Sequence, residues 1–118
     1  MNLNKIREEL TNKGMAKEGL AAWGNKGNGS LFGAMSAFSP MFAVSMTDTG
    51  ILITPFNNKT IFTDNTNLFK KEDISSVKMK GFWIFKHLEI VTNDGNKHRF
   101  DILQGANDVK KMISILGF

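Results

Sequence analysis

The chain has 118 residues, of which 42% are hydrophobic, with 15 basic and 11 acidic residues, a formal net charge of +4 and no cysteine. This length suits one domain, and the apolar share excludes a chain too polar to bury a core. The missing cysteine excludes disulfide bonds, thiol catalysis and cysteine-based zinc sites. The mild positive charge favours anionic partners without naming one.

The N-terminal sequence MNLNKIREELTNKG mixes both charge signs and has no apolar run, so it lacks the pattern of a secretory signal. We therefore expect a cytoplasmic location. Residues 27–47 are uncharged over a length that can cross a bilayer. Their serines, glycines and proline lower the apolar density, so we expect a buried or interface segment rather than a membrane span.

The first forty residues hold six of the eleven glycines and almost no β-branched residues. From residue 41 onward, Ile, Val, Thr and Phe become common, and these residues favour strands. The change predicts a helical, glycine-rich N-terminal extension over 1–40 and a β-rich domain over 41–118. Within the extension, apolar residues at helical spacing predict an amphipathic helix over 2–13. Weaker patterns predict further helical pieces over 15–23 and 30–38.

The β-rich part is divided by turn signals, of which the Asp-Gly pair at 94–95 is the clearest. The runs between these turns predict six or seven short antiparallel strands, at 42–46, 51–54, 60–63, 74–80, 82–92 and 97–103. A final amphipathic helix is predicted after Gly105, with Asn107 as its N-cap and Asp108 in its first turn. Its apolar stripe consists of Val109, Met112, Ile113 and Leu116. The predicted fold class is α+β, mainly β.

Three phrases in this part carry a family resemblance: MTDTGILI at 46–53, FKKEDISSV at 69–77 and LEIVTNDGNKHRF at 88–100. Together with the terminal helix they resemble the bacterial pleckstrin-homology-like (PH-like) and GRAM-type domains. The resemblance implies a split barrel of six to seven strands closed by a C-terminal helix. It also implies a non-enzymatic binding or scaffolding domain, since eukaryotic members bind phosphoinositides, peptides or proteins. The first forty residues have no counterpart in this pattern.

Catalysis would depend on His87 or His98, because the chain has two histidines and neither cysteine nor tyrosine. No acidic cluster at ligand spacing accompanies them, so a cross-strand surface pair is favoured over a catalytic or metal site. We therefore predict no enzymatic activity, no metal and no cofactor. The glycine-rich segment 24–30 has no lysine directly before its serine, which favours a flexible connector over a phosphate-binding loop.

Basic residues concentrate in the second half of the chain. The candidates for binding an anion or another ligand are Lys78, Lys80, Lys86, Lys97 and Arg99. Strand alternation places Lys78 and Lys80 on one face, and Lys97 and Arg99 on one face. If the two faces coincide they form a positive patch, and the alternative is a solvated outer face of the sheet. Binding of single-stranded nucleic acid is a remote further alternative.

The run VKMKGFWIFKH at 77–87 places aromatic residues between lysines, and Gly81 can break the strand there. Phe82 and Trp83 then form a hairpin tip that suits either an interfacial membrane anchor or a surface covered by protein. We expect cover by protein, since residues 28–42 are themselves apolar and need a partner. Cover by another copy of the chain predicts self-association as a homo-oligomeric structural protein. An interfacial anchor predicts a peripheral position on the anionic inner membrane surface. The interface candidates are Leu31, Phe32, Met35, Phe38, Phe82, Trp83 and Phe85.

Overall fold

The computed structural model describes residues 2–26, 41–83 and 85–118. The described residues form two α-helices and seven strands. In chain order these are α1 (Leu3–Asn12), β1 (Ala21–Lys26), β2 (Met41–Met46), β3 (Gly50–Phe56), β4 (Asn67–Lys70), β5 (Ile74–Phe82), β6 (Phe85–Thr92), β7 (Lys97–Gln104) and α2 (Ala106–Leu116). Single turns of 3-10 helix occur at Lys17–Gly19, Thr63–Asn65 and Lys71–Asp73. The prediction of a mainly-β α+β fold with a helix near each end is confirmed.

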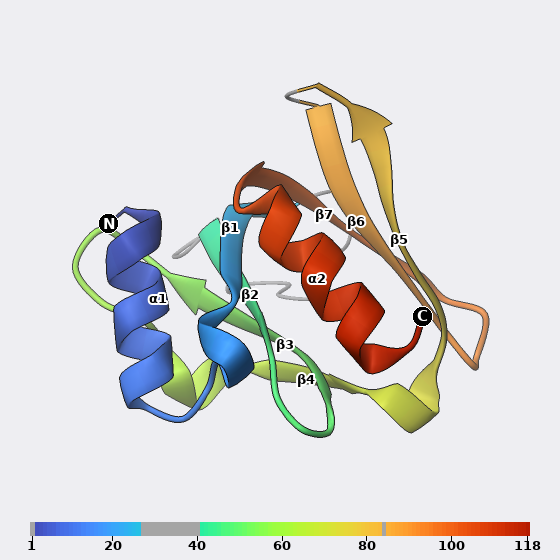
Figure 1. Ribbon diagram of the computed structural model, residues 1–118, viewed down its shortest axis with the longest axis horizontal. Helices are drawn as coiled ribbons and strands as arrows, with labels where there is room; N and C mark the ends of the chain where they lie inside the picture. The colour runs from blue at the N-terminus through green and yellow to red at the C-terminus, as the bar shows by residue number, and fades with distance from the viewer. Residues whose placement is uncertain (1, 27–40, 84) are drawn as a thin grey trace.

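The seven strands form one antiparallel sheet in the order β4-β3-β2-β1-β7-β6-β5. Figure 1 shows α2 lying across one side of this sheet, which we call the inner face. Helix α1 lies beside β1, away from α2. Within the described residues, no helix combines the length and the apolarity needed to span a bilayer. Strand β2 occupies the end of the uncharged stretch 27–47, and residues 27–40 lie outside the described residues.

Strand β1 corrects the prediction of a helical piece over 15–23. Ala21 to Trp23 are extended, and β1 pairs with β2 on one side and with β7 on the other. A Cβ on Gly24 would lie 1.7 Å from the carbonyl oxygen of Asp101, so this close approach of β1 to β7 requires glycine. The sequence does not predict this strand, because five of its six residues are Ala, Gly, Asn and Lys, which are depleted in strands. Segments on both sides of the predicted boundary at residue 40 therefore share one sheet.

The main core lies between the inner face of the sheet and α2. Its fully buried side chains come from both halves of the sheet, including Phe42 and Ile53 on one half and Leu88 and Ile90 on the other. The rings of Phe42 and Phe100 meet edge to face with their centroids 5.1 Å apart, which joins the two halves. The apolar stripe predicted for the last helix is confirmed, since Val109, Met112 and Leu116 are buried in this core and Ile113 packs at its edge.

A second core lies on the opposite, outer face, but only over β1, β2 and β3. Helix α1 covers this part of the sheet, and the predicted helix over 2–13 is confirmed as Leu3–Asn12 with Asn2 as its N-cap. The buried members of this second core are Ile6, Leu10, Ala16, Ala21, Ala43, Phe56 and Ile61. Both faces of this half of the sheet are therefore buried, which explains why β3 is buried at every position.

One carboxylate oxygen joins both helices to the sheet. The Oδ2 atom of Asp108 accepts hydrogen bonds from Arg7 Nε at 3.1 Å, Arg7 Nη2 at 2.9 Å and the backbone N–H of Ala21 at 3.1 Å. The predicted N-cap at Asn107 is wrong, because the helix already begins at Ala106 after Gly105 in a left-handed conformation. Asp108 therefore acts as a clamp between α1, β1 and α2 rather than only as a first-turn acid.

Two other predicted strands need correction, and one strand was missed. The strand predicted at 60–63 is a single β-bridge between Phe56 and Ile61, followed by a 3-10 turn at Thr63–Asn65. Strand β4 was not predicted, because its four residues alternate too briefly to give a period. The strand predicted at 82–92 begins at Phe85, since the chain reverses before it. The helical piece predicted at 30–38 lies outside the described residues.

Candidate contact surface at the tip of the β5–β6 hairpin

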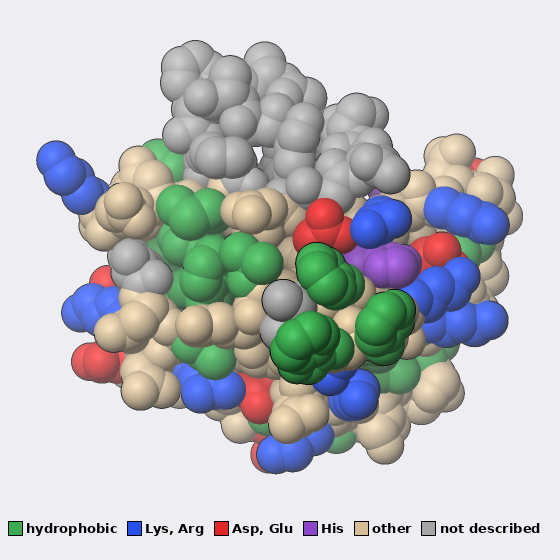
Figure 2. All heavy atoms as spheres, turned by 90° about the horizontal axis from the view of Figure 1, so that it is seen from above, with side chains coloured by type: hydrophobic (Ala, Val, Ile, Leu, Met, Phe, Trp, Pro, Cys, Tyr) green, Lys and Arg blue, Asp and Glu red, His purple; other side chains and the backbone are tan. Residues whose placement is uncertain are grey.

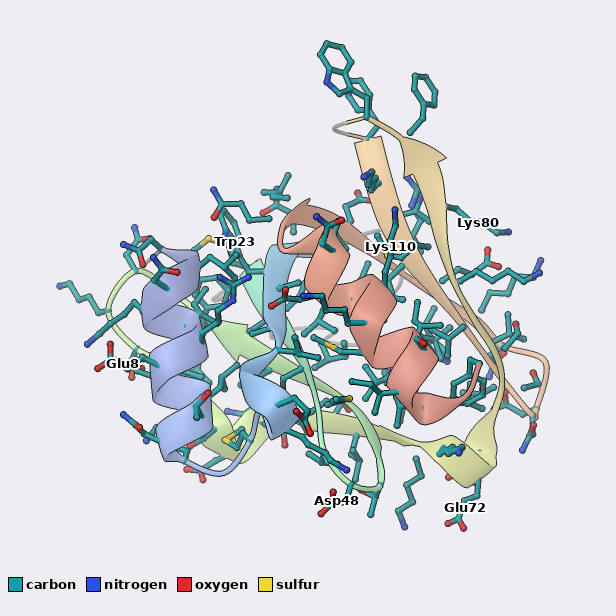
Figure 3. The ribbon with its side chains drawn as sticks, in the orientation of Figure 1. Glu8, Trp23, Asp48, Glu72, Lys80 and Lys110 are labelled. Carbon is teal, nitrogen blue, oxygen red and sulfur yellow. The ribbon has the colours of Figure 1, made fainter. Side chains whose placement is uncertain are left out.

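The hairpin of β5 and β6 projects beyond the rest of the sheet (Figure 1). Its end carries aromatic side chains that extend away from the body (Figure 3). The last pair of the ladder is Phe82 with Phe85, preceded by Gly81 with Lys86 and by Lys80 with His87. The predicted hairpin tip at Phe82 and Trp83 is therefore confirmed. We call the side chains of Phe82, Trp83 and Phe85 the aromatic tip.

The backbone at the aromatic tip is unusual at two positions. Gly81 has φ +87°, and a Cβ there would lie 2.0 Å from the carbonyl oxygen of Phe85, so a larger residue would push the strands apart. Trp83 has φ +57°, in the left-handed region that bulky residues seldom occupy. Two-residue hairpin turns favour Asn or Gly at such a position. The turn therefore carries a large ring where a small residue would fit with less strain.

The aromatic tip is open to solvent. Phe82 is 75%, Trp83 76% and Phe85 67% exposed, although aromatic side chains of this size are usually mostly buried. Figure 2, which views the hairpin end, shows hydrophobic side chains gathered there with basic side chains beside them. The described residues of the same chain therefore leave the aromatic tip uncovered. Cover by a second copy stays a prediction.

Four of the five predicted cationic candidates share one face. Across the strands, Lys78 is opposite Glu89 and Glu89 is opposite Arg99, while Lys80, His87 and Asp101 form the next row. Side chains at directly opposed positions lie on the same face, and here it is the outer face. Lys97 follows in the same alternation, whereas Lys86 is paired with Gly81 and lies on the other face of β6. The two predicted basic faces therefore coincide, without Lys86.

Acidic residues divide this outer face. The Nζ atom of Lys80 lies 3.0 Å from Glu89 Oε1, and Nε of Arg99 lies 3.1 Å from Asp101 Oδ1. The hydrogen bond from Lys80 lowers the pKa of the Glu89 carboxyl, and the nearby charges of Lys80, Lys97 and His87 act in the same direction. Among the described residues, the salt bridges found reach neither Lys78, Lys86 nor Lys97. The face is a mixed ladder rather than a continuous positive patch, and its anion-binding role stays a prediction.

The two histidines do not form the predicted cross-strand pair. His87 is opposite Asp101 on the outer face, whereas His98 is opposite the buried Ile90 on the inner face. The ring of His98 lies against that of Phe69, with centroids 5.0 Å apart. In the described parts of the chain, no group of three or more His, Asp or Glu side chains is arranged to hold a metal ion.

A hollow of about 470 Å³ lies beside the turn between β6 and β7, and its lining residues include Asp73, Asp94 and His98. The Asp94 carboxylate already accepts hydrogen bonds from the hydroxyl of Thr92 and from the backbone and side-chain N–H groups of Asn96. These bonds lower the pKa of Asp94, with the Thr92 hydroxyl as the first cause. The role of Asp94 is therefore to hold the turn.

Of the other interface candidates, Leu31, Phe32, Met35 and Phe38 lie outside the described residues, as does most of the predicted connector at 24–30.

No protein-family model matches the chain, and no curated protein is significantly similar to it in sequence.

Proposed function

We propose that the protein is a non-enzymatic PH-like binding or scaffolding domain of the cytoplasm, whose contact surface is the aromatic tip. The sheet order, in which β1 lies between β2 and β7, and the helix α2 against the inner face support the PH-like assignment. The observation that carries the function is the exposure of Phe82, Trp83 and Phe85 at the end of a projecting hairpin. A partner there is either protein or the anionic surface of the inner membrane.

The aromatic tip can supply useful binding energy when a partner covers it. An aromatic side chain buries about 150–250 Å², so the exposed part of three such side chains amounts to roughly 400 Å². At about 25 cal/mol per Å², this area corresponds to about 10 kcal/mol before the costs of association. The tip is therefore strong enough to anchor the protein but depends on neighbouring charges or a second contact for tight binding.

An enzymatic role is not favoured by the site. His87 and His98 lie on opposite faces of the sheet, so they cannot act on one reacting group. The acids nearest to the aromatic tip, Glu89 and Asp101, are each engaged by a cation on the same face. A binding function makes use of the exposed aromatic side chains, whereas a catalytic function leaves them unexplained.

The test compares the wild type with the Phe82→Ala/Trp83→Ala variant in two assays, sedimentation with vesicles and light scattering for self-association. A matched control is Leu68→Ala/Ile115→Ala, because these side chains are 41% and 51% exposed at sites away from the hairpin. We expect the wild type to associate in at least one assay, the tip variant to lose that association and the control to keep it. Association that is absent, or equal in all three proteins, would contradict the proposal.

Self-association through the same aromatic tip is the second candidate, since an exposed apolar surface is also typical of a subunit interface. It predicts a mass above the 13.2 kDa of one chain in light scattering. A protein that stays at the mass of one chain at high concentration would exclude this candidate.

A further inference from the structure

We propose that the partner of the aromatic tip is an anionic lipid bilayer, into whose interface the β5–β6 hairpin inserts end-on. This inference rests on the proposed function, namely that the aromatic tip is the contact surface. Three features of the described residues favour a lipid surface over a second copy of the chain: the shape of the tip, the charges behind it and the conformation of Trp83.

The shape of the aromatic tip is convex and narrow. Stable protein interfaces bury about 800 Å² on each partner, and three aromatic side chains expose only about half of that area. A protein partner would therefore need a deep complementary pocket or further contacts on the charged face behind the tip. Lipid needs neither, because headgroups and acyl chains rearrange around a protruding apolar group.

The charges behind the tip are placed at the depth of lipid headgroups. Lys86 follows Phe85 directly, and Lys80 lies two positions before Phe82. With a strand rise of about 3.4 Å per residue, their backbones lie about 3 and 7 Å behind the last ladder pair. Interfacial apolar groups reach about 5–10 Å into the headgroup and acyl boundary, so these ammonium groups meet the phosphates when the aromatic tip is inserted.

Lysines also flank the hairpin on both of its faces. Lys80 lies on the outer face, and Lys86 lies on the other face of β6. Two acids lie behind the tip on the outer face: Asp101, in the row of Lys80 and His87, is bridged to Arg99, and Glu89, three ladder pairs behind Gly81, is bridged to Lys80. A second copy docked tip to tip would bring two sets of lysines together, whereas an anionic surface attracts all of them.

The conformation of Trp83 is a further observation. Strain of this kind persists where surrounding structure or function maintains it, and it gathers at contact sites. The ladder pair of Phe82 and Phe85 closes the turn, so few backbone polar groups would enter the apolar region with the ring. Indole also suits this depth, because its ring is apolar and its N–H can reach the headgroups.

The test uses Trp23→Phe protein, in which Trp83 is the single tryptophan of the chain. The probes are phosphatidylcholine vesicles with or without about one third phosphatidylserine, a content high enough to give a negative surface potential. We expect Trp83 emission to shift to shorter wavelength and to be quenched by brominated acyl chains only with the anionic vesicles. Raising the salt concentration should weaken the binding.

Two sets of variants separate insertion from simple charge attraction. Trp83→Asn is made in the wild-type background, because asparagine tolerates the left-handed conformation. In vesicle sedimentation this variant should bind at least ten-fold more weakly, while its circular dichroism spectrum stays unchanged. Lys80→Gln and Lys86→Gln should each weaken binding about five-fold. The matched control is Lys59→Gln, an exposed lysine in the loop after β3, and it should have little effect.

Equal binding to neutral and anionic vesicles, or anionic binding without a Trp83 shift, would overturn the lipid proposal. So would binding that survives Trp83→Asn unchanged. If vesicles do not bind but the tip variants abolish self-association, the lipid proposal fails and the proposed function stands. If neither vesicle binding nor self-association depends on the aromatic tip, both fail.

Discussion

The outer face of the sheet differs sharply between its two halves. Over β1, β2 and β3 it is covered by α1, and Trp23 there packs edge-on against Phe56 with centroids 6.0 Å apart and donates its indole N–H to Gln104. Over β5, β6 and β7 it carries a ladder of charges, and the hairpin ends in the 76% exposed Trp83. The same residue type thus serves packing in one half and remains free for contact in the other.

This difference indicates a division between stability and binding. Substitutions on the covered half should lower the free energy of unfolding and leave vesicle binding intact in the folded protein. Substitutions at the open half should do the opposite. The following comparisons test that division.

The largest effect is expected for leucine truncation on the two halves. Leu10, on the face of α1 that packs in the second core, is fully buried, whereas Leu103 on β7 is 50% exposed on the open half. Leu10→Ala should lower the free energy of unfolding by about 3 kcal/mol, because it removes buried contacts and leaves a cavity. Leu103→Ala should cost less than about 0.5 kcal/mol. Urea denaturation measures both, and similar costs would remove the distinction between the halves.

A smaller loss is expected at the clamp that holds α1 in place. Asp108→Asn weakens the charge-assisted bonds from Arg7 and should cost about 2 kcal/mol of unfolding free energy. A double-mutant cycle with Arg7→Gln should assign most of this loss to the pair. The control, Asp64→Asn in an exposed 3-10 turn, should be nearly neutral. Additive effects of the two substitutions at Arg7 and Asp108 would mean that the pair does not act as a clamp.

Two buried hydroxyls on the covered half should respond in opposite directions. Ser45 Oγ donates to the carbonyl of Met15 at 2.7 Å, whereas the buried Oγ1 of Thr54 finds no hydrogen-bond partner among the described residues. Ser45→Ala should cost about 1 kcal/mol, because it leaves the Met15 carbonyl unpaired. Thr54→Val keeps the shape and should be neutral or stabilising by up to about 1 kcal/mol. Thermal denaturation distinguishes these results, and a large loss for Thr54→Val would point to a partner for its hydroxyl.

The smallest effect is expected from the Lys80 and Glu89 bridge on the open half. Because the folded state lowers the pKa of Glu89, its contribution to stability is present above the ordinary range of a glutamate and is lost as the pH falls through the lowered pKa. Lys80→Gln should move the Glu89 pKa back up, as followed by carboxyl chemical shifts in an NMR titration. Lys59→Gln should leave it unchanged. An unshifted titration in Lys80→Gln would show that the hydrogen bond is not the cause.

The sequence predicts those elements that have a clear period or a specific turn. The stripe of Val109, Met112 and Leu116 and the Asp-Gly turn at 94–95 are local signals, and both agree with the structure. Strand β1 could not be predicted in this way, since alanine and glycine follow no strand propensity and Gly24 is explained only by its contact with β7. The strand predicted at 60–63 is wrong for the opposite reason: Ile61 is buried in the second core, but it forms only a single bridge with Phe56 rather than a ladder.

The candidate site was predictable in part. Gly81 beside aromatic residues indicates a strand break, and the hairpin tip follows from it. The direction of Phe82 could not be predicted, because it depends on where the reversal falls in the register and on how far the hairpin extends past the core. The pairing of Lys80 with Glu89 was also missed, since cross-strand neighbours are fixed by register rather than by distance along the chain.

The position of β1 between β2 and β7 also affects how the chain is made. Trp23 and its partner Gln104 are 81 positions apart. At roughly 5–20 residues per second of synthesis, about 4 to 16 s pass between their appearances. During this time the edge of β1 that later pairs with β7 has unpaired backbone groups, and the nascent chain can bind chaperones or aggregate through it. Chains stalled on the ribosome before β7 should therefore remain sensitive to protease, and those that include β7 and α2 should become resistant.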